Sequence, residues 1–222
     1  MKKNKSIAII PARGGSKRLS NKNSALLGNI PLLVHSINFA KNNGITKIVV
    51  STDDAKIKEI AFKYGVEVID RPYNLSGDKA TTVSALKHVL ESMNENFDTV
   101  VLLQPTNPLR PKNLLKEAYK KFEDGNYDSL MTVTRNHQKF GKIVNERFEP
   151  YNYKIGQRSQ DLEPLYFENG LLYIAKASLI LENKIIGEHN YSFIVAHPFA
   201  HVDIDTKEDF EYAEYLYKRH IE

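Results

Sequence analysis

The segment that decides the fold reads Ile7-Ala8-Ile9-Ile10-Pro11-Ala12-Arg13-Gly14-Gly15-Ser16-Lys17-Arg18. Its first four residues form a short apolar run that is rich in β-branched side chains and typical of a buried strand. The paired glycines that follow let the backbone come close to a ligand, and consecutive N–H groups can form a concave site for an anion. Since ligands of open parallel sheets bind beyond the carboxyl ends of the strands, we predict a strand followed by a ligand-binding loop.

Apolar runs alternate with amphipathic stretches through the rest of the chain, which is the pattern of a parallel sheet with right-handed crossovers. We expect strands at residues 47–50, 66–69, 99–103, 129–133 and 171–174, and helices at residues 32–41, 55–64, 83–93, 114–122 and from about 206. The strands are almost continuously hydrophobic, which fits a sheet that helices cover on both faces. The sequence therefore predicts one α/β domain over residues 1–222, with a Rossmann-like, mostly parallel sheet flanked by helices.

Residues 135–168 interrupt this pattern, because they are polar and carry aromatic residues among charges. A structureless loop of this length is unusual inside a compact domain. We therefore expect an insertion with short strands of its own, which serves as a lid or as a contact between subunits.

The composition, with 41% hydrophobic and 26% charged residues, excludes a disordered, collagen-like or low-complexity protein. No apolar run approaches the roughly 20 residues that a membrane-spanning helix needs. The run at residues 7–10 is also too short for the core of a signal peptide. The chain has no cysteine, which excludes disulfides, thiolate metal sites and a cysteine nucleophile. We expect a cytoplasmic protein without a membrane segment.

The formal net charge of +4 leaves two classes of anionic ligand open, a nucleic acid and a nucleotide. Basic residues gather at the predicted loop, where they are Arg13, Lys17, Arg18 and Lys22. The loop is neither a G-x-x-x-x-G-K-[ST] phosphate loop nor a G-x-G-x-x-G dinucleotide turn. A plain Gly-Gly turn with solvated lysines is the alternative, but the position after the first strand favours a site for a polyphosphate.

Asp203 and Asp205 are two residues apart on a segment that we expect to be extended, so their side chains would point to the same face. Two such carboxylates repel each other unless a cation lies between them, and oxygen ligands completed by substrate phosphates are typical of Mg²⁺. The alternative is helix capping, since Thr206 and Asp209 have the spacing of a capping box. We assign Asp203 and Asp205 to a Mg²⁺ site, and Asp209 to the helix cap.

Further motifs follow the first loop in a fixed order: Asn21-Lys22-Asn23, Ser51-Thr52-Asp53, Arg71-Pro72, Gln104-Pro105-Thr106-Asn107-Pro108-Leu109-Arg110, Asn169-Gly170 and Asp203-Ile204-Asp205-Thr206. With this set the chain resembles the CMP-sialic acid synthetases, also called acylneuraminate cytidylyltransferases, over essentially its whole length. The resemblance implies a nucleotidyltransferase fold and a Mg²⁺-dependent enzyme that joins a nonulosonic acid to CMP from CTP and releases pyrophosphate.

The resemblance also implies which residues contact CTP. Those at the nucleotide would be Ala12, Arg13, Ser16, Lys17, Lys22, Asn23, Arg71 and Thr82, with the last two at the cytosine. Arg13, Lys22 and Asp205 would be the catalytic residues. The alternative for Arg71-Pro72 is a turn at the end of a strand, and Asp78 is an alternative cap for a helix that begins at Thr81 or Thr82.

Gln104 follows an apolar strand, so its amide would emerge at the ligand edge of the sheet, and the two prolines after it would stiffen the loop. The resemblance implies that Gln104, Lys142, Arg158 and Asn169 contact the sugar. The alternative is a proline-rich connection in which Arg110 only faces solvent. Some sialate synthetases carry an additional arginine shortly before the Asn-Gly pair, where this chain has Phe167-Glu168, and this departure would change how the acyl side chains of the sugar are recognised.

Two rival functions remain at this point. One is a sister cytidylyltransferase that uses legionaminate, pseudaminate or 3-deoxy-octulosonate. The other is a non-catalytic protein that binds a nucleotide or a nucleic acid through basic residues, which the clustering of those residues in one loop beside carboxylates disfavours. We expect no nucleic-acid or membrane partner, and the resemblance suggests a homodimer in which residues 135–168 pack on the neighbouring subunit.

Overall fold

A computed structural model describes residues 4–15, 18–19 and 21–220 of the chain. Its centre is a seven-stranded sheet in the order β11-β7-β10-β6-β1-β4-β5. β1 (Ser6–Pro11) pairs in parallel with β4 (Lys47–Thr52) and with β6 (Thr99–Leu102), and β4 pairs in parallel with β5 (Glu67–Asp70). The apolar run at residues 7–10 therefore lies in a central strand, as predicted.

The other half of the sheet contains a strand that runs against the rest. β10 (Leu165–Lys176) is antiparallel to β6 and to β7 (Ser129–Asn136), while the edge strand β11 (Asn190–Ile194) is parallel to β7. The pairing of β10 with β7 shifts register between Glu168 and Tyr173. The sheet is mostly parallel, as expected, but the direction of β10 and the existence of β11 were not predicted.

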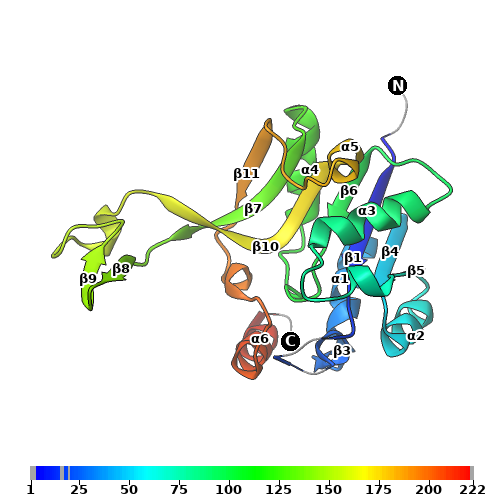
Figure 1. Ribbon diagram of the computed structural model, residues 1–222, viewed down its shortest axis with the longest axis horizontal. Helices are drawn as coiled ribbons and strands as arrows, with labels where there is room; N and C mark the ends of the chain where they lie inside the picture. The colour runs from blue at the N-terminus through cyan, green and yellow to red at the C-terminus, as the bar shows by residue number, and fades with distance from the viewer. Residues whose placement is uncertain (1–3, 16–17, 20, 221–222) are drawn as a thin grey trace.

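Helices cover both faces of the sheet (Figure 1). The side chains of β1 point alternately to the two faces of the sheet. Ala8 and Ile10 pack on the face that is covered by α1 (Leu32–Asn42), α2 (Ala55–Lys63) and α4 (Leu114–Asp124). Ile7 and Ile9 point to the opposite side and pack with α3 (Thr82–Ser92) and the short α5 (Ala177–Leu181). Since successive side chains of a strand point to opposite faces, this one apolar run contributes to two core clusters. The predicted bounds of α1 to α4 agree with these within two residues.

Smaller elements join these layers. They are η1 (Lys22–Ser24), β2 (Leu26–Leu27), β3 (Ile30–Pro31), η2 (Tyr73–Leu75) and η4 (Pro198–His201). β2 and β3 form a two-stranded hairpin that packs, through Leu27, against the last helix, α6 (Lys207–His220). This arrangement brings the C-terminal helix next to the segment that follows the first loop.

The segment 202–205 pairs with no strand of the sheet, although the N–H of Ile204 donates to the carbonyl of Thr106 at 2.8 Å. The start of α6 has the predicted capping box. Asp209 Oδ2 accepts hydrogen bonds from the N–H groups of Asp205 and Thr206, and Thr206 Oγ1 accepts one from the N–H of Asp209. The assignment of Asp209 to the helix cap is confirmed.

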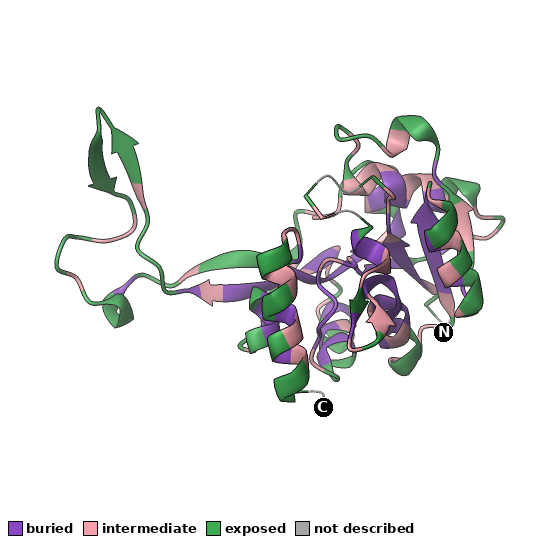
Figure 2. Cartoon of the chain, turned by 90° about the horizontal axis from the view of Figure 1, so that it is seen from below, coloured by how far each residue is buried: buried purple, intermediate pink, exposed green. Residues whose placement is uncertain are grey.

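The predicted excursion is an arm that extends from the body of the molecule (Figures 1 and 2). β7 and β10 continue into its base, and beyond them lie β8 (Gly141–Val144), β9 (Arg147–Pro150) and η3 (Ser159–Asp161). Its short strands were expected. Most of the arm is exposed (Figure 2), including large apolar side chains, namely Phe140, Ile143, Val144, Phe148, Tyr151 and Ile155.

Across the ranges that the structure describes, none of the helices combines the length and the apolar character that crossing a bilayer requires.

Gly170 lies at the irregularity of β10 and offers a test of how tightly this part of the sheet is packed. It has a φ of 73°, and a Cβ there would lie 2.8 Å from Asn107 Oδ1. We expect Gly170→Ala to lower the free energy of unfolding by about 1–3 kcal/mol more than Gly65→Ala does, because only the former overpacks a buried side chain. Gly65 also has a positive φ, of 64°, but its added Cβ meets nothing within 4 Å. Urea unfolding of both variants measures the difference, and equal losses would contradict the packing argument.

Candidate active site

The loop after β1 is held against the end of β4. The N–H of Ala12 donates to Ser51 O at 2.9 Å, and the N–H of Gly14 donates to Asp53 Oδ1 at 2.9 Å. A Cβ on Gly14 would lie 2.7 Å from the side chain of Asp54, which caps α2, so the close approach of these two segments requires glycine. Ser16 and Lys17, both predicted to hold the nucleotide, lie outside the described residues.

A pocket of about 490 Å³ opens beside this loop, at the carboxyl ends of the parallel strands. Predicted site residues that line it are Arg13, Lys22, Asn23, Arg71, Thr82, Gln104 and Asp205, and Arg18 lines it as well. The fold therefore brings together side chains from the first loop, the end of β5, the start of α3 and the segment before α6. Ala12 is buried beneath the loop and is not among the residues that line the pocket.

Lys22 is held firmly in this pocket. Only 8% of it is exposed, and its Nζ donates to Ile204 O and to Asp205 Oδ1, each at 2.8 Å. Arg18 contacts the other carboxylate oxygen of Asp205 at 2.8 Å, and Arg13 pairs with Asp78 at 3.4 Å. Each of these cations thus has a carboxylate partner that a bound anion could replace.

Arg71 is fixed at the ends of β4 and β5. Its Nε donates to Ser51 Oγ at 3.1 Å and one of its terminal nitrogens donates to Ser51 O at 2.7 Å. Burial lowers the pKa of Arg71 to about 10. Arg71 therefore has a defined position in the pocket. The helix that follows is capped by Thr81, which accepts from the N–H of Ser84, so the alternative that Asp78 is its N-cap is wrong.

Arg110 is buried and is not among the residues that line the pocket beside the first loop. It is 6% exposed, and it donates to Leu171 O at 2.6 Å, to Ser36 Oγ at 3.1 Å and to Gln104 O at 2.8 Å. Burial lowers the pKa of Arg110 to about 9. The alternative in which it faces solvent is wrong, because its guanidinium lies inside the fold and holds the loop that starts at Gln104.

A second pocket, of about 520 Å³, adjoins the first and shares Gln104 with it. Its other lining residues are Asn107, Phe167, Glu168, Asn169, Gly170, Tyr173, Ala200, His201 and Asp203. Glu168, Tyr173 and His201 were not predicted as site residues. No local sequence motif indicates Tyr173 or His201, because the register of β10 and the turn at residues 198–201 place them in the pocket.

The amide of Asn169 is already used inside the protein. Its Oδ1 accepts from Thr132 Oγ1 at 2.6 Å and from the N–H of Leu171, and its Nδ2 donates to Thr134 Oγ1 at 2.9 Å. The residue lines the second pocket, but these bonds give it a role in shaping the turn of β10. Asn107, which donates to Asn169 O and to Val202 O, joins the same turn to the segment before α6.

Lys142 and Arg158 lie on the arm, apart from the other predicted sugar-binding residues, and neither lines either pocket of its own chain. The ammonium of Lys142 lies 5.7 Å from the ring centre of Tyr151, and Arg158 pairs with Asp161 at 2.7 Å. Within one chain the structure does not bring these two cations to Gln104.

Asp203 and Asp205 line the two adjoining pockets, one each. The pKa of Asp203 is raised, first by partial burial and then by the neighbouring charge of Asp205, so the two carboxylates are close enough to repel each other. No group of three or more acidic or histidine side chains that could enclose a metal occurs among the described residues. Two oxygen donors that need further ligands fit Mg²⁺, whose shell substrate phosphates and water usually complete.

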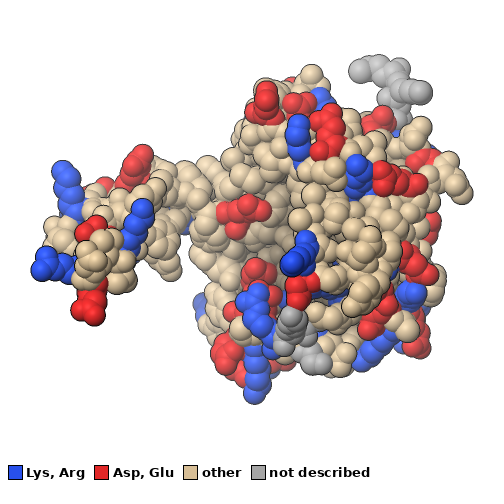
Figure 3. All heavy atoms as spheres, viewed as in Figure 1, with Lys and Arg blue, Asp and Glu red and all other residues tan. Residues whose placement is uncertain are grey.

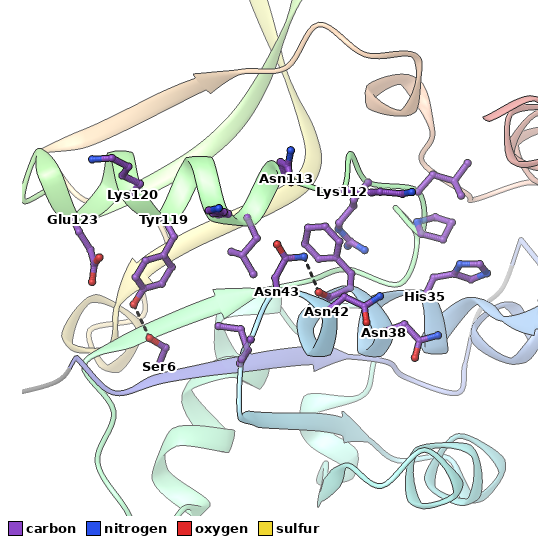
Figure 4. Close-up of a pocket in the computed structure, with 18 of the residues that line it drawn as sticks. Ser6, His35, Asn38, Asn42, Asn43, Lys112, Asn113, Tyr119, Lys120 and Glu123 are labelled. Atoms are coloured by element: carbon purple, nitrogen blue, oxygen red, sulfur yellow. Dashed lines mark hydrogen bonds between the residues drawn. The ribbon is translucent and has the colours of Figure 1, made fainter. Parts of the chain in front are cut away.

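A larger cavity lies elsewhere, between α1 and α4, and has a volume of about 1070 Å³ (Figure 4). Exposed lysine and asparagine side chains line its rim, including Asn42, Lys112 and Lys120. It contains none of the predicted site residues, and it lies beside the helices and not at the carboxyl ends of the strands. Its size alone does not make it the catalytic site.

A family model described as cytidylyltransferase matches residues 7–221. The chain belongs to the cytidylyltransferase family. It is 38% identical to a pseudaminic acid cytidylyltransferase of Campylobacter jejuni (strain 81-176), and the match covers 96% of this chain and 97% of that one. It is 34% identical to an N-acylneuraminate cytidylyltransferase of Streptococcus agalactiae serotype V, over 93% of this chain but only 52% of that relative.

The fold also resembles that of a solved cytidylyltransferase. A CMP:2-keto-3-deoxy-manno-octonic acid synthetase, solved in complex with CTP, superposes with a TM-score of 0.71 over 98% of this chain and all of that one, at 16% identity. At that identity the likeness concerns the fold alone. Membership of the family confirms the predicted resemblance and makes the protein a nucleotidyltransferase enzyme.

On the face shown in Figure 3, acidic and basic side chains are interspersed, without a single basic stripe.

Gly14 and Gly15 provide a matched pair for testing the loop of this cytidylyltransferase. A Cβ on Gly14 would lie 2.7 Å from Asp54, whereas a Cβ on Gly15 meets nothing within 4 Å in the described chain. We expect Gly14→Ala to raise the Kd for CTP by about tenfold or more, because the loop must move away from α2, whereas Gly15→Ala changes it less than about threefold. Calorimetric titration with CTP measures both. Equal Kd values for the two variants would show that the loop is not part of the nucleotide site.

Proposed function

We propose that this cytidylyltransferase transfers CMP from CTP to the anomeric hydroxyl of a nonulosonic acid and releases pyrophosphate, in a reaction that requires Mg²⁺. The observation that supports it is the pair of pockets that meet at Gln104. One holds the basic residues of the first loop, which suits a triphosphate. The other is lined by amide, carboxylate, hydroxyl and ring groups, which suits a sugar.

In this proposal, side chains of the protein neutralise the charge of the substrates and align them. CTP and a sugar acid are both anions, so the main barrier to their reaction is charge repulsion and alignment. Arg13, Arg18 and Lys22 would neutralise the phosphates, with Ser16 and Lys17 expected beside them. Lys22 needs little reorganisation, because Asp205 and the carbonyl of Ile204 already hold its ammonium group. Arg71 and Thr82 would contact the cytosine on the other side of the pocket.

The metal would be held by Asp203 and Asp205, with the substrate phosphates as its remaining partners. When bound there, Mg²⁺ supplies positive charge where the α-phosphate accumulates negative charge. Asp205 would then have two roles, since it also orients Lys22 and Arg18.

The relatives support a sugar acid as acceptor and include several kinds. The pseudaminic acid enzyme matches this chain over nearly its full length, and so does a CMP-N,N'-diacetyllegionaminic acid synthase of Legionella pneumophila, at 34% identity over 95% of both chains. A sister activity on pseudaminate or legionaminate is therefore the second candidate beside an acylneuraminate. Both candidates use the same residues for CTP and differ in what the second pocket accepts.

A substrate panel tests the proposal directly. The purified protein is incubated with CTP, Mg²⁺ and, in turn, N-acetylneuraminate, N,N'-diacetyllegionaminate, pseudaminate and 3-deoxy-octulosonate, and pyrophosphate release is measured. We expect turnover with at least one nine-carbon acid, and a loss of about 100-fold or more in kcat for Asp205→Asn, which keeps the shape but removes the charge. Thermal unfolding of the same variant shows whether it folds. Near-normal turnover by folded Asp205→Asn would refute the metal assignment, and no turnover of any acid by the wild-type protein would refute the function.

The same proposal includes a homodimer and a cytoplasmic location, where CTP is available. The arm supports the dimer, because it presents exposed apolar residues such as Ile143 and Ile155, which are 71% and 77% exposed. A dimer that covers them would remove an unusual apolar surface from water. Lys142 and Arg158, which are remote from their own pockets, would then supply positive charge to the site of the partner subunit.

Light scattering tests the arm. We expect a particle of about twice the 25.4 kDa chain mass, and we expect Ile143→Asp/Ile155→Asp to yield monomers because burying two carboxylates in an apolar interface is costly. Phe62→Asp is the control, since Phe62 is 63% exposed on α2, outside the arm. A monomeric wild-type protein at micromolar concentration would contradict the assignment. A dimer that Ile143→Asp/Ile155→Asp leaves as intact as Phe62→Asp does would contradict it as well.

A further inference from the structure

The two pockets that share Gln104 have opposite charge. The first is lined by Arg13, Arg18, Lys22 and Arg71 against two carboxylates. The second is lined by Glu168 and Asp203, and no lysine or arginine occurs among the described residues that line it. A bound sugar acid therefore meets a cationic surface at one end and an anionic surface at the other.

Glu168 is an exposed residue that lines this second pocket and is oriented by one hydrogen bond. It lies at the shift of register in β10, and one of its carboxylate oxygens, Oε1, accepts a hydrogen bond from the hydroxyl of Tyr173. Tyr173 is only 7% exposed, and its position on β10 is set by pairing with Leu102 of β6 and Met131 of β7. The other oxygen, Oε2, has no hydrogen-bond partner within the described chain, so it is an acceptor available to a ligand.

The chemistry of the proposed reaction orients the sugar between the pockets, and this step rests on the proposed function. In the cyclic form of a 2-keto sugar acid the carboxylate and the reacting anomeric hydroxyl are both attached to the same carbon, C2, at one end of the molecule. That hydroxyl must reach the phosphates, so the carboxylate lies on the cationic side. The far end of the sugar then extends towards Glu168.

Groups at the far end differ in what they require of the pocket. A hydroxyl both donates and accepts, so it can pair with many neighbours. An amide or amine N–H only donates, and leaving it without an acceptor costs the full hydrogen bond. The nearby amides of Asn107 and Asn169 are engaged with other protein groups, which leaves Glu168 as an acceptor at this place.

We propose that Glu168, positioned by Tyr173, is a specificity-determining residue that accepts a hydrogen bond from an amino or acylamino N–H at the far end of the sugar acid. It thereby favours diamino sugar acids, which carry a second nitrogen there, over acids that carry none. It also disfavours an anionic group at that end, because Glu168 already places a carboxylate there.

The test is the isosteric variant Glu168→Gln. Because the Tyr173 hydroxyl donates to the oxygen at this position, the amide NH₂ of glutamine would face the pocket, and an acceptor becomes a donor. We expect the KM for N,N'-diacetyllegionaminate or pseudaminate to rise about tenfold or more, with the KM for CTP unchanged. The KM for 3-deoxy-octulosonate, which has no nitrogen, should change less than about threefold.

Two further variants make the result specific. Tyr173→Phe, which releases Glu168 from its position, should raise the same sugar KM by a smaller factor, and Glu188→Gln, an exposed site remote from both pockets, should change nothing. An unchanged ratio of sugar KM values in active Glu168→Gln, or an equal rise in the KM for CTP, would overturn this inference alone. A wild-type protein that turns over no sugar acid with CTP would overturn the proposed function and this inference with it.

Discussion

The buried guanidinium of Arg110 is the constraint on which both pockets depend. Moving a charged group from water into the protein interior costs roughly several kcal/mol. Arg110 has no carboxylate partner among the described residues that would offset this cost. Three hydrogen bonds and a position 5.4 Å from the ring centre of Phe39 offset part of that cost. Those bonds join α1, the loop after β6 and strand β10 at one place. Gln104, which belongs to both pockets, is held there by its own carbonyl.

Strand β10, which accepts one of the hydrogen bonds of Arg110, runs antiparallel to its neighbours β6 and β7. The arm reverses the chain, so β10 returns between β6 and β7 and brings Glu168 and Tyr173 to the edge where the parallel strands end. The turn at Asn169 and Gly170 then packs against Asn107. A pocket of carboxylates thus lies next to a pocket of cations, although the residues that line them are far apart in the sequence.

Three of the four cations in the pocket beside the first loop are paired with carboxylates before any ligand binds. Arg13 pairs with Asp78, and Asp205 pairs with Arg18 and Lys22. The pairs of Arg13 and Arg18 involve side chains that are a third or more exposed, and such pairs contribute about 1 kcal/mol or less each. A triphosphate can therefore replace these partners at small cost. Lys22 differs because it is buried, so its contact with Asp205 also keeps a cation in place that would otherwise be poorly solvated.

Much of the local structure could be predicted, because its causes lie within a few residues. The apolar run at Ile7 to Ile10, the four helices that follow and the cap of α6 at Asp209 all depend on periodicity or on contacts three residues apart. The motifs of the first loop and of Gln104 and Asp205 also identified, correctly, the family to which the chain belongs. The roles of single residues within those motifs stay predictions.

The amino-acid sequence alone therefore predicts the alternation of strands and helices, the position of a glycine-rich, basic loop directly after the first strand, and the cytidylyltransferase family. The antiparallel direction of β10, the burial of Arg110, the hydrogen bonds of Asn169 inside the sheet and the distance of Lys142 and Arg158 from Gln104 became known from the three-dimensional structure. The reason is physical: each of these depends on which segments meet across the fold, and pairing between strands such as β6 and β10 is set by packing among residues some 70 positions apart, such as Leu102 and Tyr173.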